Sequence, residues 1–332
     1  QVLVIAAMIG LGQTSPALDP GWTALWAVFL AFASASQDIV IDAYRVEILA
    51  EEEQGAGAAN IVFGYRIGML VSGAGALYVA SIAPWSTVYV GMAACMGLGI
   101  LATLLAPEPE RPVIAPAIGS VMERASAWLR RAVFDPFAEF LSRPGWASFL
   151  LFILLYKLGD AAVGIMANPL YVELGFSKTE VASVVKLFGL AATLTGAFLG
   201  GLLIAKLGLI RALWICGILQ LLSNLAFSGL ALAGHDMAAL AGTIGFENLA
   251  GGMGTTAFVA FLAALCNRNY TATQYALLSS FMAVARTFMA APSGFIADQV
   301  NWPVYFLLTA IVAVPGLLLI VVLQRRLTST GR

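Results

Sequence analysis

The chain has 332 residues, of which 61% are hydrophobic and 11% are charged, and its formal net charge is −1. A soluble globular protein carries about 25% charged residues, and the mean hydropathy here is +0.91. These values exclude a disordered chain, a nucleic-acid-binding protein and an ordinary soluble enzyme. They indicate an all-α polytopic membrane protein, because the long apolar runs do not alternate as barrel strands do.

The first half of the chain predicts four membrane spans. A helix needs about 20 apolar residues to cross a bilayer. The chain opens inside an apolar run without Met, so we expect it to begin within a transmembrane helix and to lack upstream sequence. Polar, Pro and Gly residues then separate the predicted spans, which are 1–15 (partial), 22–48, 56–82 and 86–106. Residues 1–106 are thus predicted to form a partial N-terminal helical bundle.

A polar segment, 107–145, follows and is predicted to be a cytoplasmic linker. Its apolar residues recur at helical spacing, which fits a helix lying on the membrane surface. They are Val121, Ala125, Trp128, Leu129, Ala132, Val133, Phe137 and Phe140. A solvated connector with a chance apolar stripe is an equal alternative.

The second half predicts six spans and a short tail. The spans lie near 146–173, 179–206, 211–233, 238–265, 274–297 and 302–323. They form a predicted C-terminal bundle, 146–326, followed by a cytoplasmic tail, 327–332. Four spans plus six suggest a six-plus-six protein without its first two spans. Transporters built from two halves around one central cavity have this plan.

The basic residues predict the orientation. Cytoplasmic loops of membrane proteins are enriched in Lys and Arg. With 107–145 in the cytoplasm, only Lys178 falls on the outer side. The residues on the cytoplasmic side are Arg45, Arg111, Arg124, Arg130, Arg131, Arg143, Lys206, Arg211, Arg268, Arg325, Arg326 and Arg332. The C-terminus is therefore predicted to be cytoplasmic.

Four acidic and four basic residues fall inside the predicted spans. They are Asp38, Asp42, Arg66, Lys157, Asp160, Lys186, Glu247 and Arg286. A charge at the bilayer centre costs about 2.5–3.5 kcal/mol on insertion scales and normally faces a cavity or a partner. Eight such charged residues in one chain favour a polar cavity. Salt bridges between helices, with no role in transport, are the alternative for any single residue.

The acidic members are candidates for carrying a proton. Asp38 and Asp42 are four residues apart, and Arg45 continues the same helix face. Carboxylates about 6 Å apart repel in a low dielectric, which favours a shared proton. We expect Asp38 to carry the coupling proton, and the full candidate set is Asp38, Asp42, Asp160 and Glu247. Alternatively, Arg45 neutralises Asp42 in a gate or at a helix end.

The basic and amide side chains are candidates for binding substrate. Arg66 and Arg286 lie in similar stretches that suggest a weak internal repeat, and guanidinium groups suit carboxylates. Lys186 has no acid within one turn, whereas Lys157 has the alternative of pairing with Asp160 on its own helix. The full substrate-binding set is Gln37, Tyr65, Arg66, Lys157, Lys186, Gln220, Asn224, Asn248 and Arg286.

Polar contacts between helices are an equal alternative for the amides Gln220 and Asn224. No catalytic residue, metal site or cofactor is expected. The three cysteines, Cys95, Cys216 and Cys266, have no metal-binding or disulfide spacing, and His235 is predicted to be a loop residue. The glycines at 251–254 follow no strand and precede no Lys, so they predict close helix packing and not a phosphate loop.

Several stretches resemble AmpG-type muropeptide permeases of the major facilitator superfamily. The first is Ala35-Ser36-Gln37-Asp38-Ile39-Val40-Ile41-Asp42-Ala43-Tyr44-Arg45. The others are Gly64-Tyr65-Arg66, Leu155-Tyr156-Lys157-Leu158-Gly159-Asp160, Leu174-Gly175-Phe176-Ser177-Lys178-Thr179-Glu180 and Glu247-Asn248-Leu249-Ala250-Gly251-Gly252-Met253-Gly254-Thr255. The Gln-Asp-three-residue-Asp element is shared with acetyl-CoA transporters, and the later stretches point to the permeases.

The resemblance implies a major facilitator-type two-bundle fold with about ten spans present. It implies proton-coupled import of anhydromuropeptide across the bacterial inner membrane, for peptidoglycan recycling. The expected partners are this small molecule, protons and the lipid bilayer, with no nucleic acid and no enzymatic activity. A carrier of acetyl-CoA or another organic anion is the alternative. The two missing spans put transport by this chain alone in question.

Overall fold

The computed structural model describes residues 1–109 and 120–330. Every regular element in these ranges is helical, and the chain separates into two compact units. The first unit consists of Gln1–Ile48 and the described part of Gly64–Ile114. The second consists of Leu49–Phe63 and the described part of Ala115–Arg332.

The first unit contains the helices of the first four predicted spans. They are α1 (Val2–Gly12), α2 (Pro20–Ile48), the end of α3 (Gln54–Leu70) with the π-helical η2 (Val71–Gly75) and α4 (Ala76–Ala80), and α5 (Trp85–Leu105). Helix α1 packs on α2 and α5. Pro84 is the N-cap of α5 and has an extended backbone, with φ −66° and ψ 155°.

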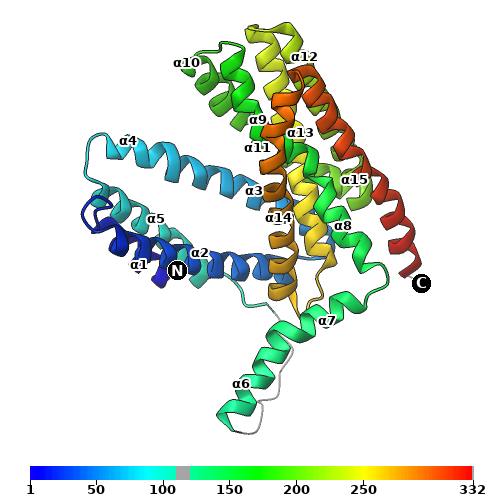
Figure 1. The fold of residues 1–332 in the computed structure, drawn as a ribbon. Coiled ribbons are helices and arrows are strands. Elements are labelled where there is room, and N and C mark those ends of the chain that lie inside the picture. Colours follow the sequence, from blue (N-terminus) through cyan, green and yellow to red (C-terminus); the bar gives the residue numbers. More distant parts are fainter. Residues whose placement is uncertain (110–119, 331–332) are drawn as a thin grey trace. The chain divides into compact units, whose positions relative to one another are not determined.

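The second unit contains η1 (Glu51–Glu53) and the start of α3, then the described part of the linker and the last six predicted spans. The linker forms α6 (Val121–Leu129), η3 (Arg130–Phe134) and α7 (Asp135–Ser142), while its residues 110–119 lie outside the described part. The spans are α8 (Trp146–Tyr156) with α9 (Leu158–Glu173), α10 (Lys178–Val181) with η4 (Ala182–Phe188) and α11 (Gly189–Leu207), α12 (Leu209–Ala233), α13 (Met237–Leu265), α14 (Thr271–Gln299) and α15 (Trp302–Thr330). Figure 1 shows these long helices of the second unit standing side by side.

Local sequence signals set the helix ends in the second unit. Ser177 Oγ accepts from the Glu180 amide, and Glu180 Oε2 accepts from the Ser177 amide at 2.7 Å, which is a capping box. Asp236 Oδ1 caps α13 by accepting from two backbone amides at 2.8 and 2.9 Å. Gly234 ends α12 with φ +75°, a conformation that glycine adopts without a Cβ clash.

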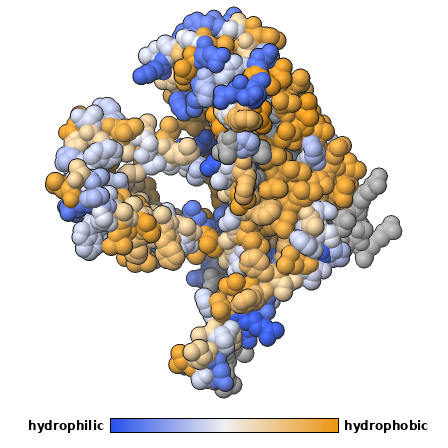
Figure 2. Space-filling view, in the orientation of Figure 1, coloured by the Kyte–Doolittle hydropathy of each residue, from blue (hydrophilic) through white to orange (hydrophobic). Residues whose placement is uncertain are grey.

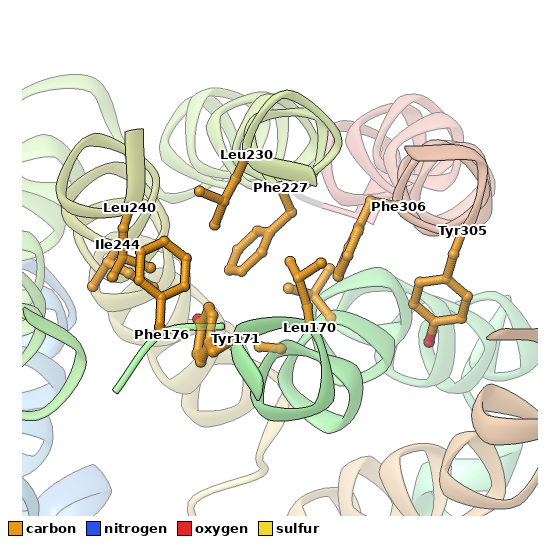
Figure 3. Packing of buried hydrophobic residues seen from close by; sticks show 11 residues of the cluster. Leu170, Tyr171, Phe176, Phe227, Leu230, Leu240, Ile244, Tyr305 and Phe306 are labelled. Carbon is orange, nitrogen blue, oxygen red and sulfur yellow. The ribbon is translucent and has the colours of Figure 1, made fainter. Parts of the chain in front are cut away.

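The core at one end of the second unit is aromatic and aliphatic. Phe227 stacks on Phe306 with 5.1 Å between ring centroids, and Leu170, Leu230 and Ile244 are buried around them. Figure 3 shows these side chains converging from α9, α12, α13 and α15. The packing holds together helices that are far apart in the sequence.

Eight helical segments among the described residues are long and apolar enough to cross a membrane. The 11-residue α1 and the 29-residue α14 coincide with the other two predicted spans. On α15, Ile311 and Leu318 are 54% and 60% exposed, as expected for a face turned to lipid. Figure 2 shows hydrophobic residues along this flank of the second unit and hydrophilic ones at the end near α10 and α12. The polytopic all-α fold is therefore confirmed.

Candidate functional site

A predicted span in the second unit is interrupted at Lys157. Helix α8 ends at Tyr156 and α9 begins at Leu158, and Lys157 has φ −101° and ψ 4°, outside the helical range. A break inside a membrane span needs partners for the backbone groups it frees. Transporters use such discontinuous helices to build polar sites near the bilayer midplane. The interruption therefore marks this level of the unit as a candidate site.

The interruption carries an ion pair. Lys157 Nζ lies 2.8 Å from Asp160 Oδ2, and their side chains are 17% and 22% exposed. Gln220 Nε2, from α12, donates to the same carboxylate oxygen at 2.7 Å. The structure thus brings together three predicted site residues, and Lys157 pairs within its own span.

Asn224 lies one helical turn beyond Gln220 on α12. Its side chain is 1% exposed, and neither its Nδ2 nor its Oδ1 has a hydrogen-bond partner among the described residues. Gly159 lies against it, since a Cβ added there would be 2.9 Å from Asn224 Nδ2 and 2.7 Å from the Thr309 carbonyl oxygen. Only a glycine lets α9 approach this closely.

Gly254 has the same function opposite Gln220. A Cβ at Gly254 would overlap the Gln220 side-chain amide. The glycine stretch that follows Glu247 on α13 therefore makes room for a polar side chain from α12. This agrees with the predicted role of these glycines in close helix packing. We name Lys157, Asp160, Gln220 and Asn224 the interrupted-helix site.

A second polar group joins α11 and α13. Thr193 Oγ1 donates to Asn248 Oδ1 at 2.8 Å, and Asn248 Nδ2 donates to Glu247 Oε2 at 2.6 Å. Asn248 Nδ2 also donates to the Ile244 carbonyl oxygen at 3.0 Å. Glu247 and Asn248 were both predicted site residues. Thr193 was not, because a threonine in an apolar run carries no distinct signal.

Two predicted cationic residues of the second unit form no ion pair or hydrogen bond with this site among the described contacts. Lys186 is exposed within the π-helical η4, and Arg286 is exposed on α14. A π-helical segment in a span often marks a functional position. The irregularity at η4 is therefore a structural reason to keep Lys186 in the candidate set.

The predicted residues of the first unit range from exposed to half-buried, and Arg45 beside Asp42 is buried. Asp38 is exposed, and Gln37 makes one long contact, 4.0 Å from its Nε2 to Met96 Sδ. Arg45 Nη2 lies 3.9 Å from Asp42 Oδ1. Tyr65 is 67% exposed and Arg66 is half-buried.

Sequence reasoning missed a polar clamp where α7 meets the turn between α13 and α14. Arg143 Nη2 and Gln274 Nε2 lie 2.6 and 2.5 Å from Glu139 Oε2, and Arg143 also donates to the Leu265 carbonyl oxygen. Burial alone raises the pKa of Glu139, but hydrogen bonds from Arg143 and Gln274 and the Arg143 charge outweigh it, so the pKa is lowered. The i,i+4 spacing of Glu139 and Arg143 was a readable signal. Gln274, 135 residues from Glu139, was not.

No cluster of three or more potential metal ligands is present in the part of the chain that the structure describes. The three cysteines are free thiols. His235 lies between α12 and α13, where its Nε2 is 3.4 Å from Glu180 Oε2.

Comparison with known proteins identifies the family. The Major Facilitator Superfamily profile matches residues 153–331. The anhydromuropeptide permease of Escherichia coli K12 is 42% identical over 332 residues, which is 99% of this chain and 66% of that protein. The putative transporter AmpG 4 of Rickettsia felis is 36% identical, covering 98% of this chain and 78% of that one.

Solved structures agree on the fold. The proton:xylose symporter XylE, bound to 6-bromo-6-deoxy-D-glucose, superposes with a TM-score of 0.70 at 12% identity, covering 96% of this chain and 77% of that one. The E. coli fucose:proton symporter FucP gives a TM-score of 0.68 at 14% identity, covering 98% and 83%. The chain spans about two thirds of the length of the E. coli permease. It belongs to the major facilitator superfamily, as a homologue of the AmpG anhydromuropeptide permeases.

Proposed function

We propose that the protein is a proton-coupled secondary transporter that imports anhydromuropeptides across the bacterial inner membrane for peptidoglycan recycling. The observation that carries this proposal is the 42% identity to the E. coli anhydromuropeptide permease over 99% of the chain. The matched relatives are named as a permease and as transporters, which supports transport and not catalysis.

The distribution of basic residues supports a cytoplasmic C-terminus and a cytoplasmic linker. Within the linker, the described residues Arg124, Arg130, Arg131 and Arg143 contribute to this bias, while Arg111 lies outside the described residues. Arg332, in the tail, also lies outside the described residues. In this proposal 1–106 and 146–326 act as the two transport bundles, connected by 107–145.

The site residues divide by charge. The candidates for the carboxylate that carries the coupling proton are Asp38, Asp42, Asp160 and Glu247. The side chains that bind cargo are Gln37, Tyr65, Arg66, Lys157, Lys186, Gln220, Asn224, Asn248 and Arg286. Cationic and amide groups in a water-poor site suit the carboxylates and peptide groups of a muropeptide.

Uptake into proteoliposomes tests the proposal. Labelled anhydromuropeptide and labelled acetyl-CoA are offered separately, with and without an acidic exterior. We expect the muropeptide to accumulate only with the proton gradient and a protonophore to abolish that accumulation. Accumulation of acetyl-CoA in place of the muropeptide would assign the chain to the organic-anion carriers. Accumulation of the muropeptide that does not depend on the proton gradient would refute proton coupling.

A further inference from the structure

The interrupted-helix site holds one cation for one carboxylate. Lys157 and Asp160 are 2.8 Å apart and balance each other, and Gln220 adds a 2.7 Å hydrogen bond to the same oxygen of Asp160. Both charged side chains keep about a fifth of their surface exposed, at 17% and 22%. The pair is therefore partly open, in contrast to Gln220 and Asn224 beside it, which are 4% and 1% exposed.

Asn224 gives the site an unused hydrogen-bonding group. Leaving a buried amide without partners costs about 1–3 kcal/mol for each group, and an apolar side chain of the same size would avoid that cost. Asn224 lies one turn from Gln220 and beside Gly159, next to Asp160 in sequence. An amide offers one donor and one acceptor face, which matches a carboxyl or peptide group.

We propose that Lys157 and Asn224 bind a carboxylate of the cargo, and that Asp160 takes up a proton from water as that carboxylate arrives. This inference rests on the proposed function and deepens it, since it names the group that the site recognises and the carboxylate that is protonated.

Charge balance links the two events. In the empty site Lys157 neutralises Asp160. A cargo carboxylate that displaces Asp160 from Lys157 would leave one uncompensated negative charge in a water-poor environment, which is costly. One proton from bulk water forms an O–H bond on Asp160 and restores neutrality, and no other bond forms or breaks. The neutral Asp160 then pairs with the Gln220 amide, which donates one hydrogen bond and accepts another.

The surroundings add few competing charges. Tyr156 on α8 and Cys216 on α12 are close enough to interact with the pair, and both are neutral in their ordinary state. Helices α12 to α15 pack together and carry other charged or titratable residues besides Cys216. Those with described side chains are Arg211, Glu247, Tyr275, Arg286, Asp298 and Tyr305. None of them makes a hydrogen bond or ion pair with Lys157 or Asp160 in the contacts described above.

Transport by proteoliposomes containing the chain tests the inference with two probes. One is a labelled tripeptide anhydromuropeptide, and the other is the same compound with its carboxylates converted to amides. We expect the carboxylate form to accumulate with the proton gradient. The Lys157→Gln/Asp160→Asn variant, which removes both charges together, should bind the carboxylate form about tenfold or more weakly and the amidated form within about twofold of the unchanged protein.

Asp160→Asn tests the role of the proton separately from the binding of the carboxylate. This variant imitates the protonated carboxyl, so it should exchange carboxylate cargo without accumulating it against a gradient. Asn224→Leu keeps the number and branching of the side-chain heavy atoms and removes the amide. It should fold at least as stably, because it removes unpaired buried groups, yet it should lose about tenfold in affinity for the carboxylate form. Lys178→Gln, at the exposed start of α10, is the matched control and should behave as the unchanged protein.

The outcomes separate the two proposals. Proton-driven accumulation by Asp160→Asn, or unchanged carboxylate binding by Asn224→Leu, would overturn this inference and leave the proposed function standing. If the unchanged protein takes up neither probe, the proposed function fails and this inference fails with it. Thermal unfolding of each variant in detergent shows whether a loss reflects folding, and Asn224→Leu is the variant for which a folding loss is not expected.

Discussion

The two units contain the same local motif in different surroundings. Each has a basic and an acidic residue three positions apart in a span, Asp42 with Arg45 in the first and Lys157 with Asp160 in the second. The first pair is 3.9 Å apart and the second 2.8 Å. Among the described contacts, another helix supplies a further donor, Gln220, to the carboxylate of the second pair.

The spans themselves differ in burial. The candidate spans of the second unit have 33–67% of their central residues buried, whereas those that contribute to the first have 6–11%. The side chains of the two pairs are about equally enclosed, at 6% and 25% exposed for Arg45 and Asp42 and at 17% and 22% exposed for Lys157 and Asp160. The comparison teaches that sequence spacing alone does not decide how tightly two charges pair. The two pairs differ in the donor that a neighbouring helix adds to the second one, Gln220 on α12.

Removing one charge should have the largest effect in the enclosed unit. Lys157→Met leaves Asp160 without its counter-charge, which should lower the free energy of unfolding by about 3 kcal/mol. Asp42→Asn in the first unit should cost less than about 1 kcal/mol, since its pair is long, at 3.9 Å. Chemical unfolding in detergent measures both. The Lys157→Met/Asp160→Leu variant is the control and should recover most of the loss, and equal losses for the two single variants would contradict the comparison.

The close approach at the helix interruption predicts the next largest effect. Gly159→Ala places a Cβ 2.7 Å from the Thr309 carbonyl oxygen and should destabilise the protein by about 1–3 kcal/mol. Gly164→Ala on the same helix has open space around the new Cβ. It should be neutral or stabilise by up to about 1 kcal/mol, through higher helix propensity. If both substitutions changed the free energy of unfolding in the same direction, α9 would not be held against α15 at Gly159.

The polar clamp predicts a pH-dependent effect. Because the pKa of folded Glu139 is lowered from 4.5, the clamp stabilises the protein above that value. This stabilisation is lost as the pH falls through the lowered pKa of the folded state. Glu139→Gln should therefore cost about 1–2 kcal/mol at pH 7, and the difference from the unchanged protein should shrink under acid conditions. Unfolding midpoints at neutral and acidic pH measure this, and a difference that grows with acidity would be the wrong sign.

The smallest stability effect is expected at Asp38, which is exposed. Asp38→Asn should change the free energy of unfolding by less than about 0.5 kcal/mol. If Asp160 takes up the proton, Asp38→Asn should also keep proton-driven accumulation. A stable Asp38→Asn protein that exchanges cargo but no longer accumulates it would move the coupling proton to the first unit.

Much of the fold was predictable because membrane spans are encoded locally. About 20 apolar residues between polar or Pro/Gly breaks define a helix without reference to any other part of the chain. The predicted boundaries 22–48, 86–106 and 238–265 lie within two residues of α2, α5 and α13. The charged candidates were equally visible, because a charge in an apolar run is conspicuous at any position.

What the sequence by itself determined is thus the set of helices and the list of polar residues inside them. Only the tertiary structure decided how those residues combine. Nothing in Tyr156-Lys157-Leu158 signals an interrupted helix, since none of these residues is Pro or Gly. The partner of Asp160 is 60 positions away on α12, and the clamp joins residues 135 positions apart. Such contacts depend on which helix faces pack together, and that choice is made by the shapes and volumes of many side chains at once.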